Sequence, residues 1–266
     1  MSAYGAERTR DRRAERHVPT GLGGMVSQLR WDILQQLRNP AAVFFTLALP
    51  LLFLVAFAAT SDDAAKAADY YVPATMALAV ASGTLTNLAV TLTYLREYGQ
   101  LKRVLVTPLP RSSYLGSRIV AAGLVALTTC VVLGIVGLIV YDAAVQQVGM
   151  LVVAVLLTLA VGSALGVLCT VMIRSETAAA PIANAIGLPL MLASGVFFPL
   201  DSTPQWFENV ARYLPFTRSV ELGVDAYAGT ATSTDLLAAV AVGGIWALVA
   251  GALAVRLFTW APMKRR

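Results

Sequence analysis

Long stretches without a single charged residue are the feature that most restricts how this chain can fold. Residues 41–60 and 149–173, for example, contain no Asp, Glu, Lys, Arg or His. A helix of about 20 apolar residues can cross the hydrocarbon core of a bilayer because it satisfies its own backbone hydrogen bonds. The stretches are apolar on every face, whereas the strands of a membrane barrel would alternate apolar and polar residues. The sequence therefore predicts an all-α integral membrane protein.

Six transmembrane helices are predicted, and the charges lie between them. The expected spans are residues 41–60, 72–95, 114–141, 149–173, 177–198 and 235–258, with a short acidic loop before the second. With the N-terminus inside, the cytoplasmic segments hold 17 of the 20 Lys and Arg residues. Basic residues concentrate in cytoplasmic loops. We therefore expect both termini in the cytoplasm and a multi-pass protein of the cell inner (plasma) membrane.

The segment before the first span has the pattern of an amphipathic helix. Over residues 25–39, Leu29, Ile33 and Leu37 recur every four positions, Trp31 lies among them, and much of the remaining surface is polar. Such a helix is expected to lie in the membrane interface. The alternative is that it extends the first span, although the proline that follows it favours a break.

The two ends of the chain are expected to lie in the cytoplasm. Residues 1–24 carry several arginines and little to bury, so they are predicted to be a disordered basic tail. Residues 40–260 would form the membrane domain, and residues 261–266 a short cytoplasmic end.

The basic loop 96–113 has features of a docking segment. Leu101, Val104 and Leu105 are spaced so that a short helix would carry an apolar ridge, and Pro108 would end that helix. An ordinary cytoplasmic loop explains the basic residues but not the ridge. A loop that docks on a partner explains both.

The sequence offers no catalytic constellation. It lacks the H-E-x-x-H, G-x-S-x-G and G-x-x-x-x-G-K-[ST] motifs, and the lone His17 has no partners for a metal site. Cys130 and Cys169 lie in apolar runs and are expected to pack as free thiols. The centres of the spans lack the ionisable residues that ion-coupled carriers retain. We therefore expect neither an enzyme nor an ion-coupled carrier, and energy, if used, would enter from outside the bilayer.

The segment 199–229 is predicted to form short helices at the outer membrane surface. Prolines divide it, and its aromatic residues are of the kind that gather at the membrane–water interface. The alternative is an irregular outer loop with an aromatic belt.

The order of these elements resembles the permeases of the type-2 ABC exporter superfamily, especially bacterial drug-exporter permeases of the daunorubicin-resistance kind. The matching features are the amphipathic helix before the first span, Arg96-Glu97-x-Gly99-x-Leu101 with Thr107-Pro108, Ser194-Gly195 with Phe198-Pro199, and Pro204-x-Trp206 followed by Leu214-Pro215. Together they cover about residues 25–260, and their combination in this order is more specific than any one of them.

The resemblance implies two permeases, as a homodimer or heterodimer, seated on two cytoplasmic ATPase subunits that bind ATP and Mg. This chain would hold no cofactor, metal or nucleic acid, and it would export a hydrophobic or amphipathic drug-like compound. A flippase for lipids or glycan carriers would use the same machinery, and a membrane scaffold could use the same loop without transport.

The resemblance also assigns residues to roles. Those coupling to the ATPase would be Arg96, Glu97, Gly99, Leu101, Lys102, Arg103, Val104, Leu105 and Pro108. The substrate pathway, between the second and fifth spans at the dimer interface, would include Thr84, Asn87, Thr91, Asn184, Met191 and Phe197. The segment 199–229 would form short extracellular helices that re-enter the outer leaflet between the fifth and sixth spans. The outer gate would include Phe198, Pro199, Trp206, Pro215 and Glu221.

Overall fold

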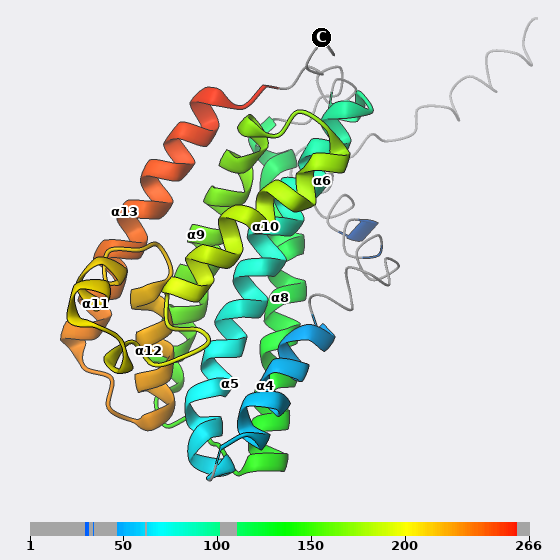
Figure 1. Ribbon diagram of the computed structural model, residues 1–266. Helices are drawn as coiled ribbons and strands as arrows, with labels where there is room; N and C mark the ends of the chain where they lie inside the picture. Colours follow the sequence, from blue (N-terminus) through cyan, green and yellow to red (C-terminus); the bar gives the residue numbers. More distant parts are fainter. Residues whose placement is uncertain (1–29, 32–33, 35–46, 62, 102–110, 260–266) are drawn as a thin grey trace, which may run out of the picture.

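The computed structural model describes residues 30–31, 34, 47–61, 63–101 and 111–259, and these form a bundle of helices that run up and down alternately (Figure 1). The elements in chain order are α4 (Leu49–Ala59), α5 (Ala64–Ala81), η2 (Ser82–Thr86), α6 (Asn87–Glu97), α8 (Arg111–Tyr141), α9 (Val148–Met172), α10 (Glu176–Ala193), η3 (Leu200–Ser202), α11 (Gln205–Ala211), α12 (Thr217–Ala228) and α13 (Ser233–Leu257). The all-α prediction is confirmed for the part of the chain that the structure describes.

Five helices are long and apolar enough to cross a membrane. They are the continuous helix Ala64–Glu97, made of α5, η2 and α6, together with α8, α9, α10 and α13. Helix α4 has 11 described residues, and part of the first predicted span lies outside the described residues. The first span, and with it the count of six, therefore stays a prediction.

The helix of the second span begins at Ala64, about two turns before the predicted position. Asp63 caps the helix, because its side chain accepts a hydrogen bond from the Lys66 backbone N–H at 3.1 Å. Lys66 and Asp69 consequently lie in the first turns of α5 instead of in a loop. Capping by an acidic side chain satisfies backbone donors that the helix leaves free. The predicted acidic loop is thus confined to the residues before Ala64.

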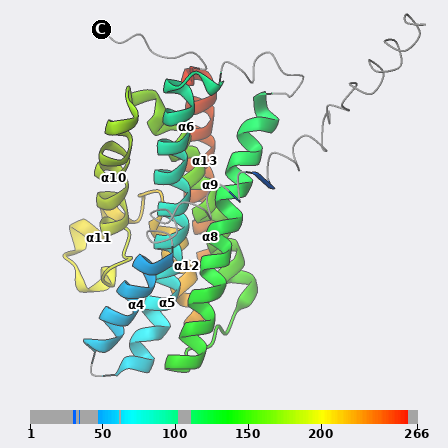
Figure 2. The same cartoon turned by 90° about the vertical axis from the view of Figure 1, so that its right-hand side faces the viewer.

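Helix α9 is the central element, and α5, η2, α6, α12 and α13 all pack against it (Figures 1 and 2). Two glycines on α9 allow the second span to approach. A Cβ on Gly166 would lie 2.7 Å from the Leu85 carbonyl oxygen, and one on Gly162 would lie 2.2 Å from the Thr84 hydroxyl. The G-x-x-x-G pattern of α9 therefore serves packing within the chain.

A π-helical turn, η2, interrupts the second span opposite these glycines. The Ser82 and Thr84 hydroxyls each donate to a carbonyl one turn earlier, Leu78 and Val80, at 2.7 Å. Wide turns of this kind disturb the regular ladder of helix hydrogen bonds and often occur at functional sites. The hydroxyl groups supply local donors to carbonyls at this irregularity.

The segment after α10 folds back into the bundle. Helix α10 ends at Ala193, earlier than the predicted limit of residue 198, and the chain turns at Gly195, whose φ is +79°. Helix α12 then packs on α5, α9 and α13, with Phe216 fully buried where it begins. Gly229, with φ +76°, ends α12 in the left-handed conformation that glycine adopts without strain.

Candidate functional site

The first part of the candidate site is the end of α6, where Arg96 is almost fully enclosed. The residue is 2% exposed, and its guanidinium donates a hydrogen bond to the Ile173 carbonyl oxygen at the end of α9. A buried guanidinium is costly unless its donors are used. Here Nη2 makes the bond, and Nη1 has no hydrogen-bond partner among the described residues. This bond therefore fastens the end of the second span to the end of the fourth.

Glu97 fastens the same point to the start of α10. Its Oε2 accepts a hydrogen bond from the Glu176 backbone N–H at 2.5 Å. Glu176 is the first residue of α10, and a carboxylate is favoured beside the free N–H groups of a helix start. We call these two contacts, Arg96–Ile173 and Glu97–Glu176, the polar clamp.

Tyr98 extends the clamp to the surface. Its side chain is 61% exposed, and a hydrogen bond with the Glu176 carboxylate is the main cause of a raised pKa of its phenol. Gly99 follows with φ +68°, a value that favours glycine, and lets the chain leave α6 in a sharp turn.

Leu101 has a different environment from the one its spacing suggested. It is fully buried, in a cluster that includes Leu92, Leu95, Tyr114 and Val167. Its side chain thus packs inside the bundle, not on an external partner. Lys102, Arg103, Val104, Leu105 and Pro108 lie outside the described residues, so the ridge as a docking surface stays a prediction.

The interfacial helix also stays a prediction. Leu29, Ile33 and Leu37 lie outside the described residues, whereas Trp31 is helical and 65% exposed.

The second part of the candidate site is a narrow pocket between the second span and α10. Asn184 and Met191 of α10 line it, as does Thr86 of η2, whose hydroxyl lies 3.2 Å from Asn184 Oδ1. The other lining residues are Leu78, Ala81, Ser82, Leu85, Gly187 and Leu188. No described residue that lines this pocket is charged.

The other residues assigned to the pathway lie elsewhere. Thr84 is fully buried against α9, and the Thr91 hydroxyl bonds to Asn87 Oδ1 at 3.0 Å further along the span. Phe197 packs edge-on against Phe53 of α4, with ring centroids 5.4 Å apart. The structure therefore brings Asn184 and Met191 together in one pocket. The other four predicted residues contact other parts of the chain: Thr84, Asn87, Thr91 and Phe197.

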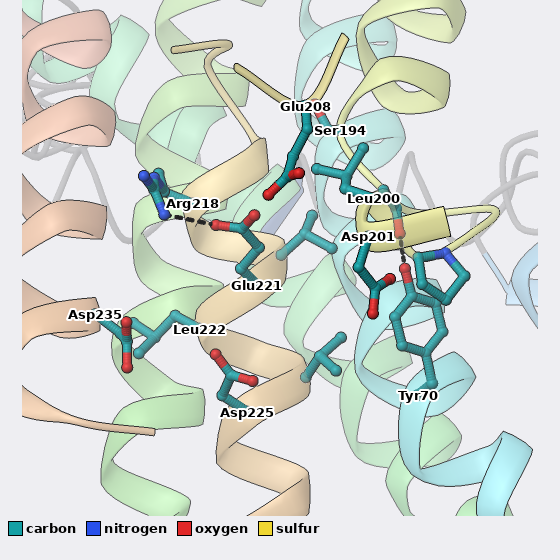
Figure 3. A pocket seen from close by; sticks show the side chains of 14 residues that line it. Tyr70, Ser194, Leu200, Asp201, Glu208, Arg218, Glu221, Leu222, Asp225 and Asp235 are labelled. Atoms are coloured by element: carbon teal, nitrogen blue, oxygen red, sulfur yellow. Dashed lines mark hydrogen bonds and ion pairs between the residues drawn. The ribbon is translucent and has the colours of Figure 1, made fainter. Parts of the chain in front are cut away.

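The third part is a polar cavity of about 460 Å³ formed by α5, the loop after α10, α12 and the start of α13 (Figure 3). Of the predicted outer-gate residues, Pro199 and Glu221 line it. Trp206 is 69% exposed, Phe198 is half-buried and Pro215 is buried. The lining residues that sequence reasoning did not single out include Tyr70, Asp201, Glu208, Arg218 and Asp225.

Two contacts shape this cavity, which we call the outer cavity. The Tyr70 hydroxyl donates to the Gly195 carbonyl and so ties the second span to the turn after α10. Arg218 Nη1 lies 3.0 Å from Glu221 Oε2 (Figure 3). Burial raises the pKa of Glu221, and the charge of Arg218 partly opposes that shift. Burial likewise raises the pKa of Asp225.

Among the described residues, no group of three or more His, Cys, Asp or Glu side chains could hold a metal ion. Both cysteines are free and buried, as predicted. The polar clamp joins the end of α6 to the end of α9 and the start of α10. The narrow pocket and the cavity at Tyr70 lie further along the second span and α10.

The fold and these sites define a multi-pass α-helical membrane protein with a polar clamp at one end and hollows along the second span and α10. Residues 26–227 match the model of the ABC-2 type transporter family, and the chain belongs to that family. It is 26% identical, over 188 residues, to a protein of Bacillus subtilis (strain 168) named as a transport permease, YvfS. That match covers 67% of this chain and 75% of the relative. The resemblance to type-2 ABC permeases is confirmed, and the chain is a transport permease subunit.

Proposed function

We propose that this permease subunit exports a hydrophobic or amphipathic, drug-like compound, with energy from a separate ATPase chain. The observation that carries the proposal is the polar clamp. It ties the start of the loop 96–113 to both α9 and α10, so a force on that loop reaches α10 directly.

The pocket beside α10 supports the same mechanism. Pro181 and Pro189 lie inside α10 and remove backbone hydrogen bonds at points where a helix can bend. Movement of α10 would widen or close the uncharged pocket at Asn184 and Met191. ATP binding by the partner would bias two positions of this element, as any coupled mechanism requires. The pocket has a volume of about 30 Å³, so it would have to widen to admit a drug-sized compound. Its uncharged lining would then suit an apolar cargo with few polar groups.

The proposed assembly contains two permeases and two cytoplasmic ATPase subunits, with ATP and Mg on the ATPases. Both termini would lie in the cytoplasm of the inner membrane. The distribution of charge supports this orientation, because Arg174 and Arg256 lie near the ends of α9 and α13 on the clamp side, whereas Asp63 and Asp142 lie at the opposite ends of the helices.

The test is a pull-down of the tagged chain from its native host in mild detergent, followed by mass spectrometry. We expect a P-loop ATPase in stoichiometric amount. A tagged unrelated multi-pass protein from the same membrane is the control. Recovery of the chain alone, or with a partner that lacks a P-loop, would refute the proposal and favour a scaffold role.

A further inference from the structure

Hydrogen bonds join the second span to α10 at three levels along the bundle. The first is the Glu97 contact of the polar clamp, at the start of α10. In the second, beside the narrow pocket, the Thr86 hydroxyl donates to Asn184 Oδ1 at 3.2 Å. In the third, just beyond the end of α10, the Tyr70 hydroxyl donates to the Gly195 carbonyl (Figure 3). We call this third contact the outer latch.

The apolar packing of α10 inside this chain is limited to one narrow stripe. Its buried residues are Ala179, Ala183, Gly187 and Met191, which recur every four positions and therefore lie on one face of the helix. Three of the four are Ala or Gly, which remove little apolar surface from contact with the surroundings. A helix held by so little packing depends more on its hydrogen bonds for its position.

The outer latch lies between the narrow pocket and the outer cavity. Met191 lines the narrow pocket, and about one turn later Ser194 and Gly195 line the outer cavity together with Tyr70. Met191 and Val196 belong to one buried apolar cluster. The Gly195 carbonyl is part of the peptide group that leads into Val196, so the bond from Tyr70 also holds Val196 in that cluster. The outer latch thus fixes the backbone that separates the two hollows.

Helix α10 can bend between the second contact and the outer latch. Pro189 lies inside the helix, between Asn184 and Gly195. Proline has no N–H group, so the Ala185 carbonyl one turn earlier loses its helical hydrogen bond and the helix is weakened at this point. The end of α10 could therefore swing about Pro189 while the contact between Asn184 and the second span stays in place.

We propose that the outer latch keeps the narrow pocket closed toward the outer cavity, and that its release lets the end of α10 swing away from the second span about Pro189. Tyr70 is then a positioning residue for transport, because it acts through the backbone of Gly195 and not on the cargo. The place of this step in export rests on the proposed function. The closure itself needs neither ATPase nor cargo, so it is tested separately.

The test measures water access to the narrow pocket in the purified full chain in nanodiscs. Met191→Cys places a thiol in the pocket, and a charged methanethiosulfonate reagent reacts with it only where water reaches, because the thiolate is the reacting form. Tyr70→Phe removes the hydroxyl and keeps the ring that packs edge-on against Tyr71. In Met191→Cys, we expect Tyr70→Phe to raise the labelling rate about three- to tenfold, as the loss of one hydrogen bond implies.

The matched control is Tyr71→Phe, which removes the hydroxyl of the neighbouring tyrosine. That hydroxyl makes no hydrogen bond to a residue that the structure describes, so the labelling rate should change by less than about twofold. The native cysteines, Cys130 and Cys169, are buried and report on general loosening. Without the added cysteine, both Tyr70→Phe and Tyr71→Phe should stay unlabelled.

Three results would overturn the proposal: an unchanged labelling rate in Tyr70→Phe, an equal rise in Tyr71→Phe, or labelling of the native cysteines in Tyr70→Phe. The ATPase pull-down tests the export function independently. A faster rate in Tyr70→Phe without a co-purifying ATPase would support the outer latch and refute the export function. A co-purifying ATPase with an unchanged rate would support the export assembly and refute the outer latch.

Discussion

The carboxylate of Glu97, at the end of the second span, accepts a hydrogen bond from the backbone N–H of Glu176, the first residue of α10. These two residues are 79 positions apart in the chain, and their contact joins the entry of the loop 96–113 to a helix that lines the narrow pocket. With the Arg96–Ile173 bond, it provides a direct structural link from that loop to α10.

The first prediction concerns this carboxylate. Glu97→Gln keeps the shape of the side chain but removes the charge, so the bond to the start of α10 should weaken by about 1–2 kcal/mol. We expect the partner ATPase to co-purify in normal amount while substrate-stimulated ATP hydrolysis falls several-fold. Glu97→Asp, which keeps the charge on a shorter side chain, is the control. Its substrate-stimulated ATP hydrolysis should lie between that of the wild type and that of Glu97→Gln. Full stimulated activity in Glu97→Gln would show that the clamp does not transmit force.

The second prediction separates packing from docking at the end of α6. Leu101 is fully buried, so Leu101→Ala should destabilise the protein by about 2–5 kcal/mol. Tyr98 is 61% exposed, so Tyr98→Ala should cost about 1 kcal/mol or less. Thermal unfolding in detergent measures both.

Recovery of the ATPase by pull-down then distinguishes the two roles. We expect Tyr98→Ala to reduce recovery while the protein stays folded. A stable Leu101→Ala protein that fails to hold its ATPase would instead restore Leu101 as a docking residue.

The third prediction is a pH dependence at the outer cavity. Burial raises the pKa of Glu221 above its ordinary value of 4.5, so the folded protein retains this proton where the unfolded chain has released it. The contribution of Glu221 to the free energy of unfolding therefore falls as the pH rises above about 4.5. We expect Glu221→Gln to remove that contribution, so that the variant gains thermal stability relative to the wild type between about pH 4.5 and 7. A difference between the two proteins that is independent of pH would contradict this assignment.

The sequence predicted the limits of the helices better than it predicted which residues contact one another. The third, fourth and sixth spans end within about three residues of their predicted limits, because apolar runs and flanking polar residues mark those limits directly. The second span begins early because Asp63 caps the helix. In the sequence, Asp63 lies in a short acidic stretch, which predicts a loop. The fifth ends early because the chain turns at Gly195 within a run that is still apolar.

Site residues were predictable by type but not by partner. The motif Arg96-Glu97 indicated an important loop, yet its partners Ile173 and Glu176 lie on other elements and no local pattern pairs them. The spacing of Leu101 indicated an apolar face, but spacing cannot show whether the protein itself or a partner covers that face. Thr84 and Thr86 are both polar residues of one span, but the side chains of two residues two positions apart point to different sides of a helix. Thr84 faces α9, and Thr86 lines the pocket.

The fourth prediction tests the close approach of the second and fourth spans. A Cβ on Gly166 would lie 2.7 Å from the Leu85 carbonyl oxygen and 3.0 Å from the Leu85 Cα, both backbone atoms of η2. Backbone atoms cannot rotate away as a side-chain end can, so Gly166→Ala must separate the helices or distort the π-helical turn. We expect a loss of about 1–3 kcal/mol in the free energy of unfolding. Because η2 lines the pocket with Asn184 and Met191, transport activity should fall even at temperatures where the variant remains folded.

The matched control is Gly251→Ala on α13, where no atom lies within 4 Å of an added Cβ. Alanine is the better helix former, so this variant should be neutral or more stable by up to about 1 kcal/mol. Thermal unfolding in one detergent compares the two variants. If Gly166→Ala were as stable as Gly251→Ala, the π-helical turn would have to yield without cost. The contact between η2 and α9 would then not be the constraint that positions the pocket.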